Sequence, residues 1–241
     1  MPNLSRRSKF GDMEFFEAVK SRRSIRAYTD ETVPESVVER ALDAALLAPN
    51  SSNMQTWGFY WVRSPREKSL LIQACMNQGA ARTAQELVVV VAEPRRWKEN
   101  RQEMLRILNE NQAPRFALDY YSKLIPFTYG LRWLAPLKWL LFCVAGWFRP
   151  MVRRPWSGRD VEEVSIKSAA LASENFMLAV TAQGYSTCPM EGFDEVRVRR
   201  LLGLSRSDRV VMVISVGKEN AARGVWGPQI RFSREKFIKR V

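Results

Sequence analysis

The chain contains no histidine among its 241 residues. A Ser-His-Asp or Cys-His catalytic set is therefore impossible, and so is a metal site built on imidazole. Histidine is also the side chain whose ordinary pKa lies closest to neutral pH, so any catalysis must work without the usual proton carrier. This absence favours chemistry that a bound cofactor supplies.

Cysteine is scarce as well. Cys75, Cys143 and Cys188 are an odd number of thiols and form no C-x-x-C pair, which argues against a disulfide framework or a zinc site. We therefore expect no metal. The basic N-terminal stretch MPNLSRRSKFGDMEFF lacks a long apolar run with a small-residue cleavage site, so no secretory signal is predicted and we expect a cytoplasmic protein.

Acidic residues are few relative to basic ones. The chain has 25 Asp and Glu against 38 Lys and Arg, giving a net charge of +13. Such an excess favours an anionic partner, namely nucleic acid, acidic lipid or a phosphorylated ligand, although a solvated basic surface is the alternative. No helix-turn-helix, zinc-finger or RNP-like pattern is present, and the aromatic residues gather in one apolar run instead of alternating with cations. We therefore do not expect nucleic-acid binding.

The length allows one large domain or two small ones, and the alternation of helices with a few buried strands predicts the α+β (α/β) class. The predicted helices are 13–21, 34–49, 65–76, 162–183 and 195–202. The predicted strands are 58–63, 87–92 and 209–217. The last two strands are nearly continuous β-branched runs, which are typical of strands buried on both faces. Gly184 follows the longest helix and is expected to end it.

Two polar motifs near the N-terminus fit no core pattern. The first is Arg22-Arg23-Ser24 with Arg26, directly after the first predicted helix. Guanidinium forks beside a hydroxyl suit a phosphate group, although arginine clusters also occur on solvated faces. The second is the loop APNSSNMQTW at residues 48–57.

This loop resembles the A-P-S-S-x-N-x-Q-P-W loop of the FMN-dependent nitroreductase family, and RRSIR at residues 22–26 resembles that family's first flavin motif. The segment CPMEGFD at residues 188–194 resembles the family's P-x-x-G-F turn. The chain closes with VVMVISVGK and then GPQIR, where the family carries a basic residue for the flavin phosphate. Thr56 and Asn50 depart from the pattern, since they replace a proline and a serine. The four motifs nevertheless stand in the family's order.

The resemblance implies a single nitroreductase-like domain over residues 1–241, with a central mixed, mostly antiparallel sheet flanked by helices, in an obligate homodimer with FMN at the subunit interface. It implies that Arg22, Arg26 and Arg231 hold the phosphate and ribityl end, and that the backbone of Glu191 and Gly192 faces the reactive edge of the ring. The implied FMN contacts are Arg22, Arg23, Ser24, Arg26, Pro49, Asn50, Ser51, Asn53, Gln55, Asn77, Pro189, Met190, Glu191, Gly192, Gln229 and Arg231. Of these, Asn77 resembles a position where some relatives contact the edge of the flavin ring. The departure from the pattern is Ala80, where relatives often carry a lysine, and the nearby Arg82 is the candidate substitute.

The implied activity is transfer of hydride from NADH or NADPH, through flavin N5, to an electron-poor acceptor such as a nitroaromatic or a quinone. No protein nucleophile is needed, so no catalytic side chain is assigned. The alternatives are a related flavoprotein with another reaction, such as dehalogenation, and a non-catalytic flavin-binding protein at a membrane surface. The small residues of the helix at 162–183 suit either close packing between two subunits or the core of one.

One segment of the chain does not fit a minimal member of that family. Residues 115–157 form an apolar and basic insertion. It contains Trp133, Trp139, Trp147 and Trp156, together with the cations Arg132, Lys138, Arg149, Arg153 and Arg154. The apolar run at 139–148 has ten residues, whereas a spanning helix needs about 20. We expect a lid, a dimer cover, or an element that contacts an anionic membrane, in which case the protein would sit peripherally at the inner face.

Overall fold

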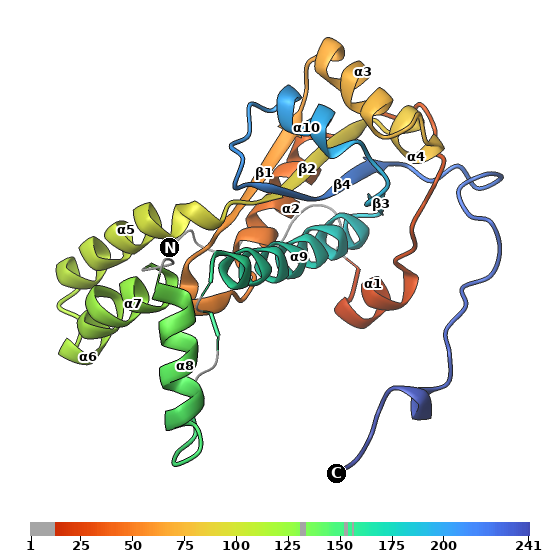
Figure 1. Cartoon of the computed structure of the whole chain (residues 1–241). Coiled ribbons are helices and arrows are strands. Elements are labelled where there is room, and N and C mark those ends of the chain that lie inside the picture. Colours follow the sequence, from red (N-terminus) through yellow and green to blue (C-terminus); the bar gives the residue numbers. More distant parts are fainter. Residues whose placement is uncertain (1–12, 131–133, 152–153, 156) are drawn as a thin grey trace.

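The computed structural model describes residues 13–130, 134–151, 154–155 and 157–241. In this part of the chain, four strands form one antiparallel sheet that lies between two layers of helices (Figure 1). Arg132, Trp133, Arg153 and Trp156, which the sequence assigns to the insertion, lie outside the described residues, as does the segment 1–12.

The sheet has the order β1-β2-β4-β3. Its strands are β1 (Trp57–Val62), β2 (Glu86–Ala92), β3 (Ser186–Met190) and β4 (Arg209–Gly217). The helices are α1 (Phe15–Ser21), α2 (Glu35–Leu46), α3 (Pro65–Ala74), α4 (Gly79–Thr83), α5 (Trp97–Glu110), α6 (Arg115–Asp119), α7 (Ile125–Tyr129), α8 (Ala135–Ala145), α9 (Gly158–Ala182) and α10 (Glu195–Leu201). Short helical turns are η1 (Ser51–Asn53), η2 (Pro94–Arg96), η3 (Tyr120–Leu124) and η5 (Arg234–Lys236).

Strand β2 is buried on both faces, as its sequence predicts. Val88 and Val90 point into a core shared with α2 and α9. Leu87 and Val89, which alternate with them, point into a second core shared with α3, α4 and α10. The period of two along the strand thus joins the two helical layers through one central strand.

The longest helix, α9, lies along the first of these cores. A capping box between Ser157 and Asp160 starts it, and Gly184, with φ of +80°, follows its end as the sequence predicts. Ala169 and Ala172 are fully buried in the core that α9 shares with α2. These two small residues therefore build the core of a single chain and are not available to a second subunit.

The sequence did not predict β3. Pro189 and Cys188 made this segment resemble a turn, but β3 lies at the edge of the sheet, where a residue without an N–H is tolerated. The four strands pair only antiparallel. An isolated parallel bridge joins Ser24 to Thr187. This bridge attaches the segment Arg22–Arg26 beside β3.

The insertion has two parts with different surroundings. Elements α6, η3 and α7 pack beside α5, and Ile125 and Tyr129 are buried in a small cluster with Met54, Trp97 and Val161. Helix α8 instead projects away from the body (Figure 1). The single-domain reading with this insertion stays a prediction.

Candidate functional site

The segment Arg22–Arg26 is fixed between β3 and the start of the C-terminal tail. The N–H of Ile25 donates to the carbonyl of Thr187 at 3.0 Å, and the N–H of Arg26 donates to the carbonyl of Gly224 at 2.7 Å. The guanidinium of Arg23 donates to the carbonyl of Gly227 at 2.6 Å. Backbone pairing on both sides therefore holds three arginines close together.

Arg22 has an unmet bonding requirement. Its Nη1 is buried without a hydrogen-bond partner in the described structure, and its Nε lies 3.6 Å from the Oε1 of Glu174. The hydroxyl of Thr187 is likewise buried and unpartnered. Because buried polar groups in native proteins are almost always paired with protein, water or a ligand, these two groups mark a position where a ligand can bind.

The surroundings of Cys188 show which side chains converge here. Burial raises the pKa of the Cys188 thiol, while the nearby Arg26 and Arg22 cations and a hydrogen bond with Ser24 act in the opposite direction. Three predicted site residues therefore surround one position on β3. The local positive potential suits a phosphate.

Two loops, the one at residues 77–79 and the turn that contains Gly192, lie beside the segment Arg22–Arg26. The Nε2 of Gln78 donates to the carbonyl of Gly192 at 2.5 Å, so the loop that carries Asn77 lies against the turn after β3. A Cβ at Gly79 would lie 2.8 Å from the carbonyl oxygen of Arg26, which shows how closely this loop approaches the arginine segment. We call the surface formed by residues 22–26, 77–79 and 188–192 the arginine surface; it also holds the predicted Pro189, Met190 and Glu191.

The second predicted motif, the loop 49–55 that contains Pro49, is folded by its own polar side chains. Asn50 accepts from the N–H of Gln55 at 2.8 Å and donates to the side chain of Asn53 at 3.3 Å. Ser52, Asn53 and Gln55 have φ of 55°, 50° and 47°. Left-handed conformations outside glycine are sparsely populated and often mark binding sites.

Tyrosines of the insertion hold this loop in place. Tyr129 donates to the hydroxyl of Ser51 at 3.1 Å, and Tyr121 donates to the carbonyl of Ser52 at 3.1 Å. The hydroxyls of Tyr120 and Ser52 are 2.7 Å apart. Sequence pattern alone does not predict these contacts, because 68 to 78 residues separate the partners along the chain.

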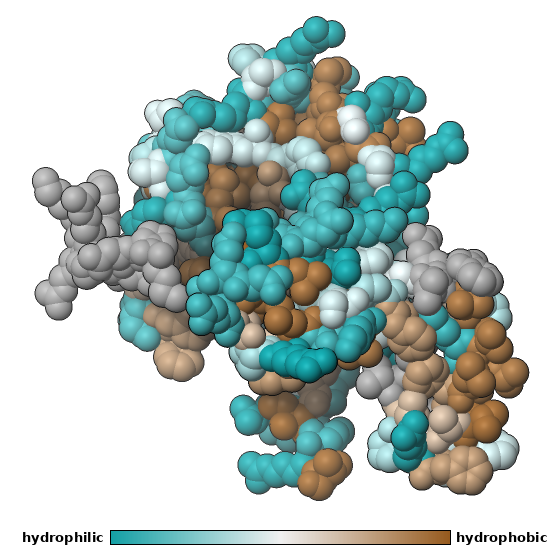
Figure 2. Space-filling view, turned by 90° about the vertical axis from the view of Figure 1, so that its left-hand side faces the viewer, coloured by the Kyte–Doolittle hydropathy of each residue, from teal (hydrophilic) through white to brown (hydrophobic). Residues whose placement is uncertain are grey.

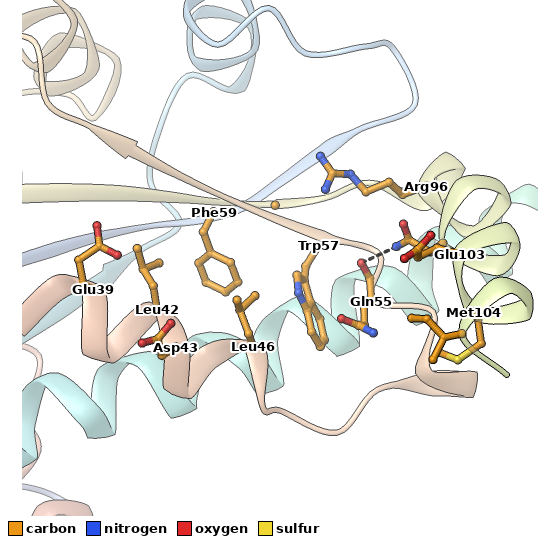
Figure 3. Close-up of a pocket in the computed structure, with 13 residues that line it drawn as sticks. Glu39, Leu42, Asp43, Leu46, Gln55, Trp57, Phe59, Arg96, Glu103 and Met104 are labelled. Atoms are coloured by element: carbon orange, nitrogen blue, oxygen red, sulfur yellow. Dashed lines mark hydrogen bonds between the residues drawn. The ribbon is translucent and has the colours of Figure 1, made fainter. Parts of the chain in front are cut away.

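A cavity of about 540 Å³ lies beside the loop, between α2, β1 and α5 (Figure 3). Leu42, Leu46, Trp57 and Phe59 give it an apolar wall. Gln55 lines it too, and its carbonyl accepts a hydrogen bond from Asn100 on α5 at 3.1 Å. This volume is within the range of small-molecule sites.

The loop and the arginine surface lie at different places along α9. Met54 of the loop shares a buried cluster with Val161, whereas Arg22 pairs with Glu174. Val161 and Glu174 are 13 residues apart in α9, which corresponds to about 20 Å at the helical rise. One chain therefore does not bring the two motifs to a common point.

The remaining predicted residues, Gln229 and Arg231, lie on the C-terminal tail. This tail leaves β4 and runs away from the sheet (Figure 1). Arg231 is exposed and donates to the carbonyl of its neighbour Ile230 at 2.9 Å. The structure thus brings Arg22, Ser24 and Arg26 together with 188–192, and it does not place Arg231 with them in one chain.

Residues that sequence reasoning missed also contribute to the arginine surface. Gln78 donates a hydrogen bond to the Gly192 turn, and Thr187 forms an isolated β-bridge with Ser24. The ring centroid of Trp226 lies 4.2 Å from the guanidinium carbon of Arg26. Gln78 could have been found from its place beside Asn77 and Gly79. Nothing in the sequence pattern marks Thr187 or Trp226.

The family model for the nitroreductase family matches residues 19–123 and 129–218. The chain belongs to the nitroreductase family. A relative from Thermus thermophilus named NADH dehydrogenase is 28% identical over 201 residues, which cover 83% of this chain and 84% of that protein. This membership confirms the expected family, fold and enzyme class.

Solved structures agree on the fold. A nitroreductase family protein from Streptococcus pneumoniae has a TM-score of 0.72 at 22% identity, over 95% of this chain and 100% of that one. The NADPH:FMN oxidoreductase of Vibrio harveyi, solved with NAD+, has a TM-score of 0.62 at 16% identity, over 94% of this chain and 76% of that one. Within the residues that the structure describes, none of the helices has both the length and the apolar character needed to span a bilayer.

Proposed function

We propose that this protein is an NAD(P)H-dependent FMN oxidoreductase that works as a homodimer and reduces an electron-poor acceptor such as a nitroaromatic or a quinone. The observation that carries the proposal is the buried, unpartnered Nη1 of Arg22, which lies beside Ser24, Arg26 and Cys188. The names of the Thermus relative and the Vibrio neighbour, NADH dehydrogenase and NADPH:FMN oxidoreductase, support the donor and the cofactor.

The residues present fit FMN. Arg22 and Arg26 would pair with its phosphate, because guanidinium groups present paired donors to phosphate oxygens. Gly192 is exposed, and the nearest atom to a Cβ at this position is the Gln78 amide nitrogen at 3.3 Å, so the backbone there is open to a flat ring. When bound, FMN supplies two-electron transfer between a nicotinamide and an acceptor.

The homodimer is supported by two independent features. First, the arginine surface and the loop 49–55 are about 20 Å apart along α9 in one chain, so a site that uses both draws them from two chains. Second, the tail exposes large apolar residues, among them Trp226, Ile230, Phe232 and Phe237, which water does not favour. A second copy would cover them and could bring Arg231 to its neighbour's flavin site.

The first experiment identifies the cofactor and the donor. The purified protein should be yellow and should release FMN, not FAD, on denaturation. Under anaerobic conditions, excess NADH or NADPH should bleach the flavin absorbance in a stopped-flow instrument. A protein that binds FMN but stays oxidised with both donors would rule out the reductase function while leaving flavin binding intact.

The second experiment tests the shared site. One variant carries Arg22→Gln with Arg26→Gln, and the other carries Ser51→Ala with Asn53→Ala. When the two are unfolded and refolded together at equal amounts, about half of the dimers are mixed, and one of their two sites is free of substitutions. Roughly a quarter of wild-type activity should return. No recovery from two soluble, dimeric variants would show that each site belongs to one chain.

A further inference from the structure

Helix α8 has an unusual outer surface for a protein in water. Its sequence is APLKWLLFCVA, and large apolar residues are exposed around it. These residues are Leu137, Trp139, Leu140, Leu141 and Val144. Figure 2 shows apolar side chains gathered on a lobe that projects below the body. Contiguous exposed apolar surface of this kind marks an interaction site.

The single charge of α8 is turned inward. Lys138 is 3% exposed, and its Nζ donates to the carbonyls of Phe127 at 2.6 Å and Gly130 at 3.1 Å. These carbonyls end α7, so the ammonium group locks the base of α8 to the packed half of the insertion. Burial lowers the pKa of Lys138. The outer face of α8 is therefore left without charge on a fixed support.

The tip of the projection adds two aromatic rings and a cation. Trp147 and Phe148 are 85% and 84% exposed, and Arg149 follows them at the surface. Tryptophan and phenylalanine beside arginine are typical of segments that lie at the headgroup level of a membrane. Eleven residues of α8 span about 16 Å, which is enough to enter one leaflet but not to cross the bilayer.

The charge around α8 indicates which kind of surface would bind it. From Tyr120 to Arg159 the chain has seven Lys and Arg and no Asp or Glu. Lys138 is buried, and Lys123 and Arg154 pair with Asp119 and Glu163 at the two flanks of this segment, so the exposed cation at the tip is Arg149. An anionic bilayer offers both an apolar interior for the exposed side chains of α8 and a negative surface for Arg149 at the tip. We propose that α8 and the tip at residues 146–149 dock this protein on an anionic lipid bilayer. This proposal does not depend on the bound cofactor or on the reaction.

The experiment is flotation of the full-length protein with vesicles of phosphatidylcholine alone or with about 30% phosphatidylglycerol. We expect flotation at low salt with the anionic vesicles and little with the neutral ones. A Trp147→Ser, Phe148→Ser variant should lose about tenfold or more in partition coefficient. Val196→Ser, an exposed apolar position on α10 at the opposite end of the molecule, should bind as the wild type does.

A second variant keeps the apolar tip. Arg149→Glu should reduce binding to anionic vesicles by about tenfold or more, because each cation near such a surface contributes several-fold in affinity. For a direct readout, Trp147→Cys in a Cys143→Ser background can be labelled with an environment-sensitive dye, since Cys75 and Cys188 are buried. The dye emission should shift to the blue with anionic vesicles.

Three results would overturn the proposal. One is failure of the wild-type protein to float with anionic vesicles at low salt. Another is an equal loss of binding in Val196→Ser. The third is a Trp147→Ser, Phe148→Ser variant that floats normally but changes its oligomeric state in light scattering, because α8 would then pack on a second copy.

Discussion

Replacement of Arg22 by glutamine should separate a ligand role from a structural one. Within the described residues, Arg22 Nη1 is buried without a hydrogen-bond partner, and the Nε of Arg22 lies 3.6 Å from the Oε1 of Glu174. That distance is long for a strong ion pair, and Glu174 is about half exposed. The pair should therefore contribute little to stability, whereas a phosphate on Nη1 would satisfy a buried donor.

The magnitude follows from these contacts. A hydrogen bond to a charged group contributes about 1.5–3 kcal/mol, so Arg22→Gln should raise the dissociation constant for FMN roughly 10- to 150-fold. The free energy of unfolding of the apoprotein should change by less than about 0.5 kcal/mol. Glu174→Gln removes the competing anion, and it should leave FMN affinity unchanged or improve it.

The assay is fluorescence titration of apoprotein with FMN, with urea denaturation of the apoprotein measured in parallel. Arg63→Gln is the matched control, because Arg63 makes an exposed bidentate pair with Glu35 at 2.7 and 2.9 Å. Two outcomes refute the reasoning. Either Arg22→Gln binds FMN as tightly as Arg63→Gln does, or Glu174→Gln weakens FMN binding as much as Arg22→Gln, which would show that the ion pair itself is required.

Two further predictions concern the core and the thiols. Phe176 is fully buried with its ring stacked 6.5 Å from Phe59, so Phe176→Ala should lower the free energy of unfolding by about 3–5 kcal/mol in urea denaturation, and a loss below about 1 kcal/mol would contradict this packing. Burial raises the pKa of Cys75 from its ordinary value of 9.0 to about 11, and it also raises the pKa of Cys188, so at pH 8 a thiol reagent should label Cys143 rapidly and the other two only after denaturation. The folded state holds the Cys75 proton more tightly than the unfolded state does. The stability contributed by the protonated Cys75 thiol should therefore be complete below pH 9.0 and should be lost as the pH rises through about 11. Rapid labelling of all three native thiols at pH 8 would contradict both the burial and the raised pKa.

Much of the fold was predictable because the core strands carry a strong local signal. The strand at 209–217 has the predicted bounds, and the strand predicted at 87–92 begins one residue earlier, at Glu86. Both are runs of β-branched residues that are buried on both faces, so period and composition agree. Strand β3 escaped prediction since its edge position, which permits Pro189, is a property of the whole sheet and not of the segment.

The candidate site was predictable as motifs but not as an arrangement. Local sequence located the arginine segment, the loop 49–55 and the Gly192 turn, because each uses residues suited to phosphate or to unusual backbone conformations. It could not show that Thr187 pairs with Ser24 or that Gln78 fixes Gly192. Those contacts depend on which strands become neighbours. The proposed place of Arg231 at a neighbour's flavin site requires a second copy, which no single-chain pattern specifies.

The insertion connects the two proposals physically. Its first half holds the loop 49–55 through the hydroxyls of Tyr120, Tyr121 and Tyr129, while its second half is α8, locked to the first by Lys138. One rigid element therefore joins the predicted flavin loop to the proposed membrane surface. If α8 enters a bilayer, the loop and its neighbouring cavity are held close to the lipid headgroups, because α8 is only about 16 Å long. An acceptor dissolved in the membrane, such as a quinone, would then approach the site along the insertion, whereas a water-soluble nitroaromatic would gain nothing from docking. Vesicles that carry a lipophilic quinone should therefore accelerate turnover in the wild type more than in Trp147→Ser, Phe148→Ser, with equal rates for both proteins on a soluble nitroaromatic.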